Sequence, residues 1–215
     1  MSLMCELGTP VPIRFNILTV CTGNICRSPL AEILLKDRLE QWGVVQTASA
    51  GTGALVGHQM TPQTIAIARE HGARDPEQHR ARDLAIEHLR AADLTIALTR
   101  AHRSEIVAML PRGSRHTFTL RELARLLEAI QPSDLATVAA LPIDDTAARF
   151  SKLIDIAAGY RGYVAPPEDE NDDDVIDPYR RGDEIYRLAT AQLVPAVETV
   201  VARFGLAATI TADQV

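Results

Sequence analysis

Residues 14–42 read RFNILTVCTGNICRSPLAEILLKDRLEQW. The first seven of them, residues 14–20, are mostly apolar and rich in β-branched side chains, as in a buried strand, whereas apolar residues recur at helical spacing from Pro29 onward. A short loop that contains Gly23 joins the two segments. This order places the loop amides at a helix N-terminus, where unpaired N–H groups and the helix dipole attract an anion.

The same loop carries a cysteine and an arginine separated by five residues, Cys21 and Arg27. A thiol attacks phosphorus only as its thiolate, and a helix N-terminus favours the ionised form. Arg27 offers a planar fork that can hold two phosphate oxygens, which a lysine cannot do. A buried structural cysteine beside a surface arginine is the simpler interpretation of two such residues. The flanking strand and helix favour instead a phosphate site with Cys21 as the nucleophile.

Residues 20–32, VCTGNICRSPLAE, resemble the signature of the low-molecular-weight protein tyrosine phosphatases. Residues 49–52 (SAGT), 79–82 (HRAR) and 177–179 (DPY) are also similar to segments of that family, and they occur in the same order. The resemblance implies that Asp177 is the general acid. By itself, Asp-Pro-Tyr is ordinarily a turn that precedes a helix. A cysteine mechanism nevertheless needs one carboxylic acid, because a phosphate ester leaves poorly unless its oxygen is protonated.

The resemblance also implies roles for residues around the loop. The expected substrate-binding residues are Thr22, Gly23, Asn24, Ile25, Cys26, Ser28, Leu55 and Tyr179. Ser28 would donate to the thiolate, and Ser49 and His79 would support the loop through Asn24; helix caps or surface polar residues are the alternative interpretation. Leu55 falls near the position of the family's first wall aromatic, and Arg180 stands where a second aromatic is common. The preference for phosphotyrosine over other phosphate esters therefore stays open.

These residues together predict a phosphate monoester hydrolase, in particular a protein tyrosine phosphatase, that works through a cysteinyl-phosphate. Its catalytic residues would be Cys21, Arg27 and Asp177, and its substrate a phosphotyrosine protein or a small phosphate ester. Arsenate reductases that share this fold and loop are one alternative, but they need further redox cysteines, and no cysteine follows Cys26. The other alternative is a non-catalytic phosphate-binding module. No cofactor and no metal are expected, because no cluster of His, Asp and Glu has convincing ligand spacing.

Strand and helix patterns alternate along most of the chain. Strands are expected at residues 14–20, 44–48, 94–98 and 115–119, and helices at 29–42, 61–71, 83–90, 103–110 and 183–204, the last kinked at Pro195. Such alternation predicts an α/β protein with a parallel sheet covered on both faces and a ligand site beyond the carboxyl ends of its strands. With the family resemblance, it predicts a flavodoxin-like three-layer domain with a four-stranded parallel sheet.

One domain is expected over residues 14–205, between a flexible segment at 1–13 and a C-terminal tail at 206–215. A helical insertion is expected at about 120–174, because residues 120–130 and 146–158 both carry apolar side chains at helical spacing. The apolar face of the first insertion helix, expected to serve as packing surface, consists of Leu120, Leu123, Leu127 and Ile130. Residues 160–174, with consecutive prolines and an acidic run, are interpreted as a solvated, mobile loop.

The chain has 215 residues and a formal net charge of −6, and residues 168–174 alone carry six carboxylates. We expect the acidic run to discourage polyanionic substrates. The remaining charge is balanced without a basic stripe, so nucleic acid is not an expected partner. The three cysteines are typical of a reducing compartment, and no segment is interpreted as a signal peptide or a membrane span, so a cytoplasmic location is expected. The sequence does not indicate an oligomeric state.

Overall fold

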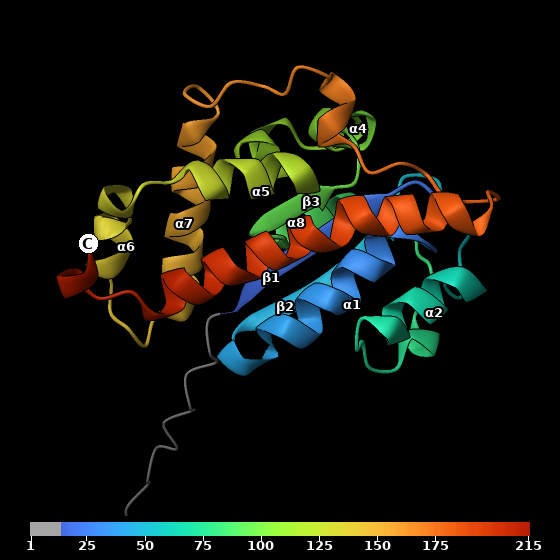
Figure 1. The fold of residues 1–215 in the computed structure, drawn as a ribbon, viewed down its shortest axis with the longest axis horizontal. Helices are drawn as coiled ribbons and strands as arrows, with labels where there is room; N and C mark the ends of the chain where they lie inside the picture. Colours follow the sequence, from blue (N-terminus) through green and yellow to red (C-terminus); the bar gives the residue numbers. More distant parts are fainter. Residues whose placement is uncertain (1–13) are drawn as a thin grey trace, which may run out of the picture.

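Four parallel strands form one sheet in the order β2-β1-β3-β4 in this computed structural model, which describes residues 14–215 (Figure 1). The strands are β1 (Phe15–Cys21), β2 (Val45–Gly51), β3 (Leu94–Ala97) and β4 (Thr117–Thr119). Cys21 pairs with Gly51 and Val20 with Ala97, so three strands end at the same edge of the sheet. The expected flexible segment 1–13, which includes Cys5, lies outside the described residues.

Helices connect the strands and follow the last of them. They are α1 (Arg27–Leu39), α2 (Pro62–Glu70), α3 (Ile86–Ala91), α4 (Arg100–Met109), α5 (Leu120–Ala129), α6 (Ala136–Ala139), α7 (Thr146–Tyr160) and α8 (Asp183–Thr209). Short 3₁₀ segments are η1 (Glu40–Trp42), η2 (Pro76–Gln78), η3 (Pro111–His116), η4 (Pro132–Leu135), η5 (Glu170–Asp173) and η6 (Ala212–Gln214). The expected α/β fold with a four-stranded parallel sheet is confirmed.

Side chains of β1 alternate between two apolar clusters. Phe15 and Ile17 belong to the larger cluster, which contains residues of α1, α5, α7 and α8. Leu18 and Val20 point to the other face and pack with residues of α3 and α4. Because a strand sends successive side chains to opposite faces, the apolar run of β1 is buried on both sides. The helices therefore form a layer on each side of the sheet, as expected.

Several element boundaries differ from the sequence-based expectations. Helix α1 begins at Arg27, two residues before Pro29, and α8 continues past Gly205 to Thr209. Proline is tolerated within α8 because Pro195 lies on its exposed side. Strand β4 is shorter than predicted because residues 111–116 form η3. The short helix α6 was not predicted.

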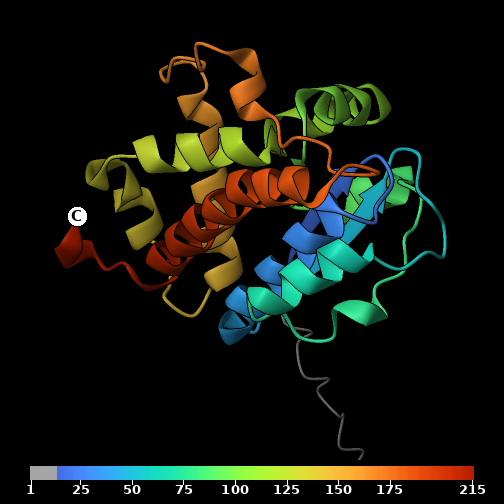
Figure 2. The same ribbon diagram turned by 45° about the vertical axis from the view of Figure 1, so that its right-hand side comes forward.

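The insertion helices pack into the main core. Leu120, Leu123 and Leu127 are fully buried, so the prediction that they form packing surface is confirmed. Phe150 of α7 makes an edge-to-face contact with Phe15 of β1, with ring centroids 5.7 Å apart. Figures 1 and 2 both show α5 and α7 beside α8. The insertion thus extends the hydrophobic core on one face of the sheet.

Helix α8 is long and apolar enough, by length and composition, to cross a membrane. The expectation that no segment reaches that length is therefore wrong. In this structure α8 packs against α1, α5 and α7, and Leu193, Val197 and Phe204 on that side are buried. Such packing accounts for the apolar character of α8 as a core helix.

Candidate active site

The loop between β1 and α1 turns its carbonyl groups outward. Carbonyl oxygens of Cys21, Thr22, Gly23 and Ile25 accept hydrogen bonds from the amides of Thr52, Gly53, Leu55 and Thr61, at 3.0 to 3.1 Å. The Asn24 carbonyl accepts from His79 Nε2 at 2.7 Å. In contrast, no amide N–H of residues 22–27 has a hydrogen-bond partner within the described residues. The loop thus presents a ring of unpaired donors at the N-terminus of α1, which is the arrangement that binds an anion.

Two backbone positions make this conformation possible. Asn24 adopts a positive φ of 53°, which asparagine tolerates better than most residues. A Cβ atom at Gly51 would lie 2.2 Å from the Thr22 carbonyl oxygen, so only glycine lets β2 approach the loop this closely. The SAGT segment therefore contributes to the loop geometry through its glycine as well as its serine.

The Asn24 side chain determines which way the hydroxyl of Ser28 points. Asn24 Nδ2 donates to Ser28 Oγ at 2.9 Å and to Ser49 Oγ at 2.8 Å. Because Ser28 Oγ accepts from Asn24, its single proton is free for Cys21 Sγ, 3.0 Å away, which is closer than the Ala50 carbonyl at 3.5 Å. This geometry makes Ser28 a hydrogen-bond donor to the sulfur, and that bond stabilises a thiolate.

A second layer holds Asn24 itself. The Arg82 amide donates to Asn24 Oδ1 at 2.9 Å, and Ser49 Oγ donates to Glu32 Oε2 at 2.5 Å. His79 Nδ1 lies 3.9 Å from the same carboxylate, and burial lowers the pKa of His79. The structure brings Ser49 and His79 to Asn24, where the resemblance placed them. Glu32 and Arg82 were not predicted.

Arg27 and Asp177 meet at the mouth of the loop. Arg27 is buried; its Nη2 lies 3.1 Å from Asp177 Oδ2, and its Nη1 donates to the Val175 carbonyl at 3.0 Å. The Asp177 side chain is 54% exposed, and its Oδ1 accepts from the Tyr179 amide at 3.2 Å. A carboxylate far along the chain thus lies beside the arginine of the loop.

A small hollow of about 130 Å³ opens above the loop. Its lining consists of Cys21, Thr22, Gly23, Ile25, Cys26, Arg27, Gly53, Leu55, Asp177 and Tyr179. Leu55 and Tyr179 thus stand at the wall positions that the resemblance gave them, and the Arg180 guanidinium lies over the Tyr179 ring at 5.1 Å. Asn24 and Ser28 do not line the hollow but support the loop around it. Among residues 14–215, no group of three or more His, Cys, Asp or Glu side chains could hold a metal ion.

His102 is a further residue at this site that the sequence did not reveal. Its Nε2 lies 2.8 Å from Thr22 Oγ1 in the loop, and its Nδ1 lies 2.8 Å from Thr99 Oγ1. Burial, with the charge of Arg27 as the next cause, lowers the pKa of His102 to about 4. The ring is therefore neutral at pH 7. Its position in the chain offered a signal, because α4 follows the carboxyl end of β3, next to the loop.

Tyr186 of α8 lies on the other side of the loop. Its hydroxyl donates to Thr61 Oγ1 at 3.1 Å, and Cys26 Sγ lies 3.7 Å from both oxygens. Burial raises the pKa of the Cys26 thiol and raises that of Tyr186 to about 12. Cys26 is therefore a protonated thiol near neutral pH.

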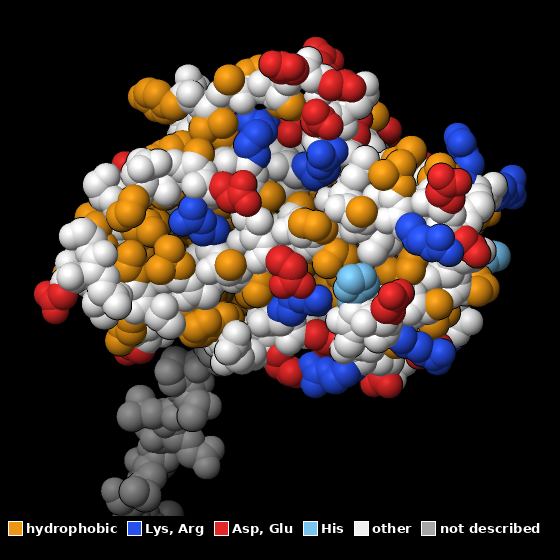
Figure 3. All heavy atoms as spheres, in the orientation of Figure 1, with side chains coloured by type: hydrophobic (Ala, Val, Ile, Leu, Met, Phe, Trp, Pro, Cys, Tyr) orange, Lys and Arg blue, Asp and Glu red, His pale blue; other side chains and the backbone are white. Residues whose placement is uncertain are grey.

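The acidic run before Asp177 lies at the surface, as its composition predicts, but it also forms ion pairs that the sequence did not reveal. Its carboxylates pair with arginines of α4 and α5, in a part of the surface that Figure 3 shows as an acidic cluster with basic side chains beside it. The pairs are Glu170 and Asp174 with Arg100, Asp172 with Arg121, and Asp173 with Arg125. Arg125 Nη2 reaches both oxygens of Asp173, at 3.0 and 3.2 Å. The arginines offset much of the negative charge that was expected to discourage polyanionic substrates.

Comparisons with known proteins agree with this geometry. A sequence model described as low molecular weight phosphotyrosine protein phosphatase matches residues 16–134. A probable low molecular weight protein-tyrosine-phosphatase EpsP of Ralstonia solanacearum is 39% identical over 108 residues, which are 50% of this chain and 72% of that protein. Etp of Escherichia coli K12, a low molecular weight protein-tyrosine-phosphatase, is 41% identical over 109 residues, which are 49% of this chain and 71% of that protein.

Solved structures extend the likeness over most of the chain. The YwlE arginine phosphatase of Geobacillus stearothermophilus superimposes with a TM-score of 0.61 and 25% identity, covering 89% of this chain and 93% of that one. The family match stops at residue 134, so the structure alone brings Asp177 to the loop. The loop, its supports and the match over residues 16–134 show that this chain belongs to the low molecular weight phosphotyrosine protein phosphatase family.

Proposed function

We propose that this enzyme hydrolyses phosphotyrosine in proteins, with Cys21 as the nucleophile and a cysteinyl-phosphate as the intermediate. The observation that carries the proposal is the loop itself. Among residues 14–215, every amide from residue 22 to residue 27 lacks a partner, whereas the carbonyls of the same loop are bonded away from it, and the Ser28 hydroxyl donates a hydrogen bond to Cys21 Sγ. Donors fixed in place before the substrate arrives stabilise developing negative charge without reorganisation.

The first chemical step transfers the phosphoryl group to sulfur. The Cys21 thiolate attacks phosphorus, the S–P bond forms, and the P–O bond to the leaving group breaks. Loop amides and Arg27 hold the three equatorial oxygens. Protonated Asp177 gives its proton to the leaving oxygen, and Tyr179 and Leu55 flank the leaving group. Substrate phosphate takes the place of Asp177 on Arg27, which frees the carboxyl group for this step.

The second step regenerates the enzyme. Asp177, now a carboxylate, takes a proton from water as the oxygen of that water attacks phosphorus. The new P–O bond forms, the S–P bond breaks, and Cys21 leaves as the thiolate that Ser28 stabilises. Inorganic phosphate then departs, and Asp177 gives up its proton to solvent as Arg27 returns to its ion pair with the carboxylate. The carboxylate takes up a proton again when the next substrate displaces it from Arg27. His102 acts through Thr22, as a positioning residue.

The size of the hollow supports a phosphate on a protein side chain. Its volume of about 130 Å³ is below the roughly 300 Å³ at which pockets for whole small molecules begin, so it encloses only the end of a substrate. Leu55, Ile25 and Tyr179 make its walls apolar, which suits the flat ring of phosphotyrosine. The sparse cysteines, of which Cys21 and Cys26 are free and buried, support a reducing, cytoplasmic setting.

The test compares one peptide sequence carrying phosphotyrosine, phosphoserine or phosphoarginine. We expect kcat/KM to be highest for phosphotyrosine, and acid-quenched enzyme to carry an acid-stable phosphate on Cys21. A clear preference for phosphoarginine would replace the proposed substrate but keep the nucleophile. Absence of turnover with all three peptides and with para-nitrophenyl phosphate, despite phosphate binding, would support the non-catalytic module instead. Arsenate reduction stays disfavoured, because no cysteine follows Cys26 to carry electrons away.

A further inference from the structure

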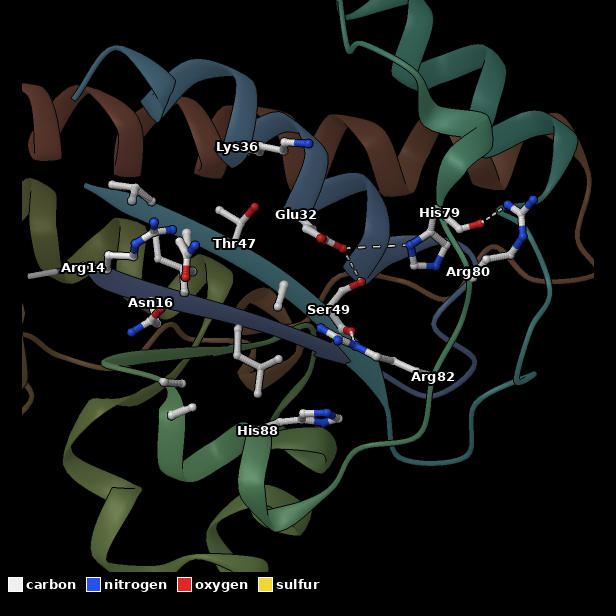
Figure 4. A pocket seen from close by; sticks show the side chains of 17 residues that line it. Arg14, Asn16, Glu32, Lys36, Thr47, Ser49, His79, Arg80, Arg82 and His88 are labelled. Carbon is white, nitrogen blue, oxygen red and sulfur yellow. Dashed lines mark hydrogen bonds and ion pairs between the residues drawn. The ribbon is translucent and has the colours of Figure 1, made fainter. Parts of the chain in front are cut away.

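A groove of about 750 Å³ runs along the outer edge of β2, away from the hollow above Cys21 (Figure 4). Glu32 and Lys36 of α1 line one side of it, and His88 of α3 lines the other. Figure 4 shows Arg14 at one end of the strand and Arg82 at the opposite end. Because β2 is an edge strand, the floor of this groove includes backbone as well as side chains.

The edge of β2 has free backbone groups. The N–H and C=O groups of Gly51 both point to the outer side of the sheet. Its N–H donates to the Arg82 carbonyl at 2.9 Å, and its C=O accepts from the Leu84 amide at 2.7 Å. The two-residue repeat of a strand puts the same groups of Ser49, Thr47 and Val45 on that side. Arg82 Nε covers the Ser49 carbonyl at 2.7 Å, but no hydrogen bond within the described residues uses the outer groups of Val45 and Thr47.

The strand also lacks the usual protection of an exposed edge. Natural edge strands carry lysine, proline or an inward charge that prevents pairing with another chain. β2 reads VQTASAG, with no charge and no proline. The Thr47 hydroxyl adds an unsatisfied polar group, because its oxygen is buried and makes no hydrogen bond within the described residues. β2 is therefore able to accept a further strand.

The charge of the groove selects the partner. Arg14, Lys36, Arg80 and Arg82 line it, and none of them lies within 4.0 Å of a carboxylate of the described residues. The one acidic lining residue, Glu32, already accepts from Ser49. Ten other arginines of the described chain are in ion pairs, and the protein as a whole carries a net charge of −6. A cationic groove on an acidic protein attracts an acidic ligand and disfavours a second copy of the same groove.

We propose that the β2 edge binds an extended, acidic segment of a partner protein, which adds to the sheet as a fifth strand. Backbone pairing at Val45 and Thr47 supplies hydrogen bonds, while acidic side chains reach Lys36 on the helix side and Arg14 or Arg80 at the ends. The open stretch, residues 45–49, spans about 16 Å, which five residues of an extended peptide match. The site is distinct from the phosphate hollow, and binding there does not depend on the proposed activity.

The groove nevertheless touches the supports of the phosphate loop. Ser49, Glu32 and His79 line it, and the same residues hold Asn24 or contact its partners. An occupant at this end of β2 therefore contacts the network that orients Ser28. A change of turnover caused by peptide binding would depend on the phosphatase activity proposed above. Peptide binding itself does not depend on that activity and is measured directly.

Three fluorescein-labelled peptides test the proposal with the full-length protein, by fluorescence polarisation. (Glu-Val)₄ offers charge and backbone donors, (Lys-Val)₄ reverses the charge, and (Glu-Pro)₄ keeps the charge but has half of the backbone N–H groups replaced by proline. We expect (Glu-Val)₄ to bind at least tenfold more tightly than either of the others. Equal binding of (Glu-Pro)₄ would reduce the site to a polyanion contact and overturn strand addition.

Variants and hydrogen exchange locate the site. Arg14→Glu/Lys36→Glu should weaken (Glu-Val)₄ binding at least tenfold, whereas the control Arg112→Glu/Lys152→Glu, with the same change of net charge, should leave it unaltered. Peptide binding to the wild-type protein should slow amide exchange at Val45 and Thr47. Equal losses in both double variants, or protection confined to other strands, would contradict the proposal. Sedimentation that shows a dimer of the free protein with the β2 edge buried would also contradict the proposal.

Discussion

Replacing His102 by glutamine should make the folded protein less sensitive to acid. The ordinary pKa of a histidine is 6.5, and burial lowers that of His102 to about 4. Between these values the unfolded chain binds a proton at this position and the folded chain does not. Stability therefore rises with pH across this window, and it is lost as the pH falls from about 6.5 toward 4.

The size of the effect follows from the two values. One pKa unit corresponds to about 1.4 kcal/mol, so His102 should cost the folded state about 1.2 kcal/mol at pH 5.5 and about 2.5 kcal/mol at pH 4.5, relative to pH 7. His79 and His88, whose pKa values burial also lowers, add losses of the same sign. Those losses are common to the wild-type protein and the variant, and they cancel in the difference.

The assay is urea unfolding of wild-type protein and His102→Gln at pH 7.0, 5.5 and 4.5. The difference in unfolding free energy between the two proteins should change by about 2.5 kcal/mol in favour of the variant from pH 7.0 to pH 4.5. His58→Gln is the matched control, because the His58 side chain is exposed and forms no hydrogen bond within the described residues. A difference that stays constant within about 0.5 kcal/mol would refute the argument, because His102 would then be able to protonate inside the fold.

The other predictions concern the chemistry. Cys21→Ser should lose turnover by about three orders of magnitude or more yet still bind phosphate, because Arg27 and the loop amides remain; near-normal turnover would exclude Cys21 as the nucleophile. Asp177→Asn should slow aryl phosphates with poor leaving groups far more than para-nitrophenyl phosphate, and should bind phosphate more tightly because no carboxylate competes for Arg27; an equal rate loss would leave Asp177 a scaffold residue. After peroxide, Cys26→Ser should recover less activity with dithiothreitol than wild type, because Cys26 can trap oxidised Cys21 as a disulfide. Burial raises the pKa of Cys26, so the fraction of reactive Cys26 thiolate, and with it the protection, should grow as the pH rises from 7 to 9. Equal recovery of the two proteins at every pH would make Cys26 a packing residue.

The strand, the loop and the helix around Cys21 could be predicted because their signals are local. Five apolar residues among seven give β1, and the order of Cys21, Asn24, Arg27 and Ser28 within eight positions reflects one continuous turn of backbone. The supporting roles of Ser49 and His79 were predicted from the family resemblance. The structure adds the direction of the contacts, in which Asn24 donates to Ser28 and leaves the serine proton to sulfur.

The residues that the sequence did not reveal act across long separations. His102 meets Thr22 from 80 residues away, and Tyr186 meets Cys26 from 160. Nothing in the local pattern distinguishes such residues from core side chains. The ion pairs of the acidic run were missed for a related reason. Its composition is typical of a solvated loop, but the arginines that pair with it lie on α4 and α5, as far as 74 residues before it.

Residues 120–174 do not displace Asp177, because the chain just before it is tied to three elements outside that segment. The Val175 amide donates to the Leu98 carbonyl at the end of β3, at 2.9 Å, and the Val175 carbonyl accepts from Arg27. The Ile176 amide donates to Gln192 Oε1 of α8 at 2.8 Å. Since these contacts fix the backbone at residues 175 and 176, α5, α6 and α7 could be accommodated between β4 and this segment without moving the carboxyl group. The number of residues between Cys21 and Asp177 is therefore free to vary, whereas the distance between Arg27 and Asp177 is set by the sheet and the last helix.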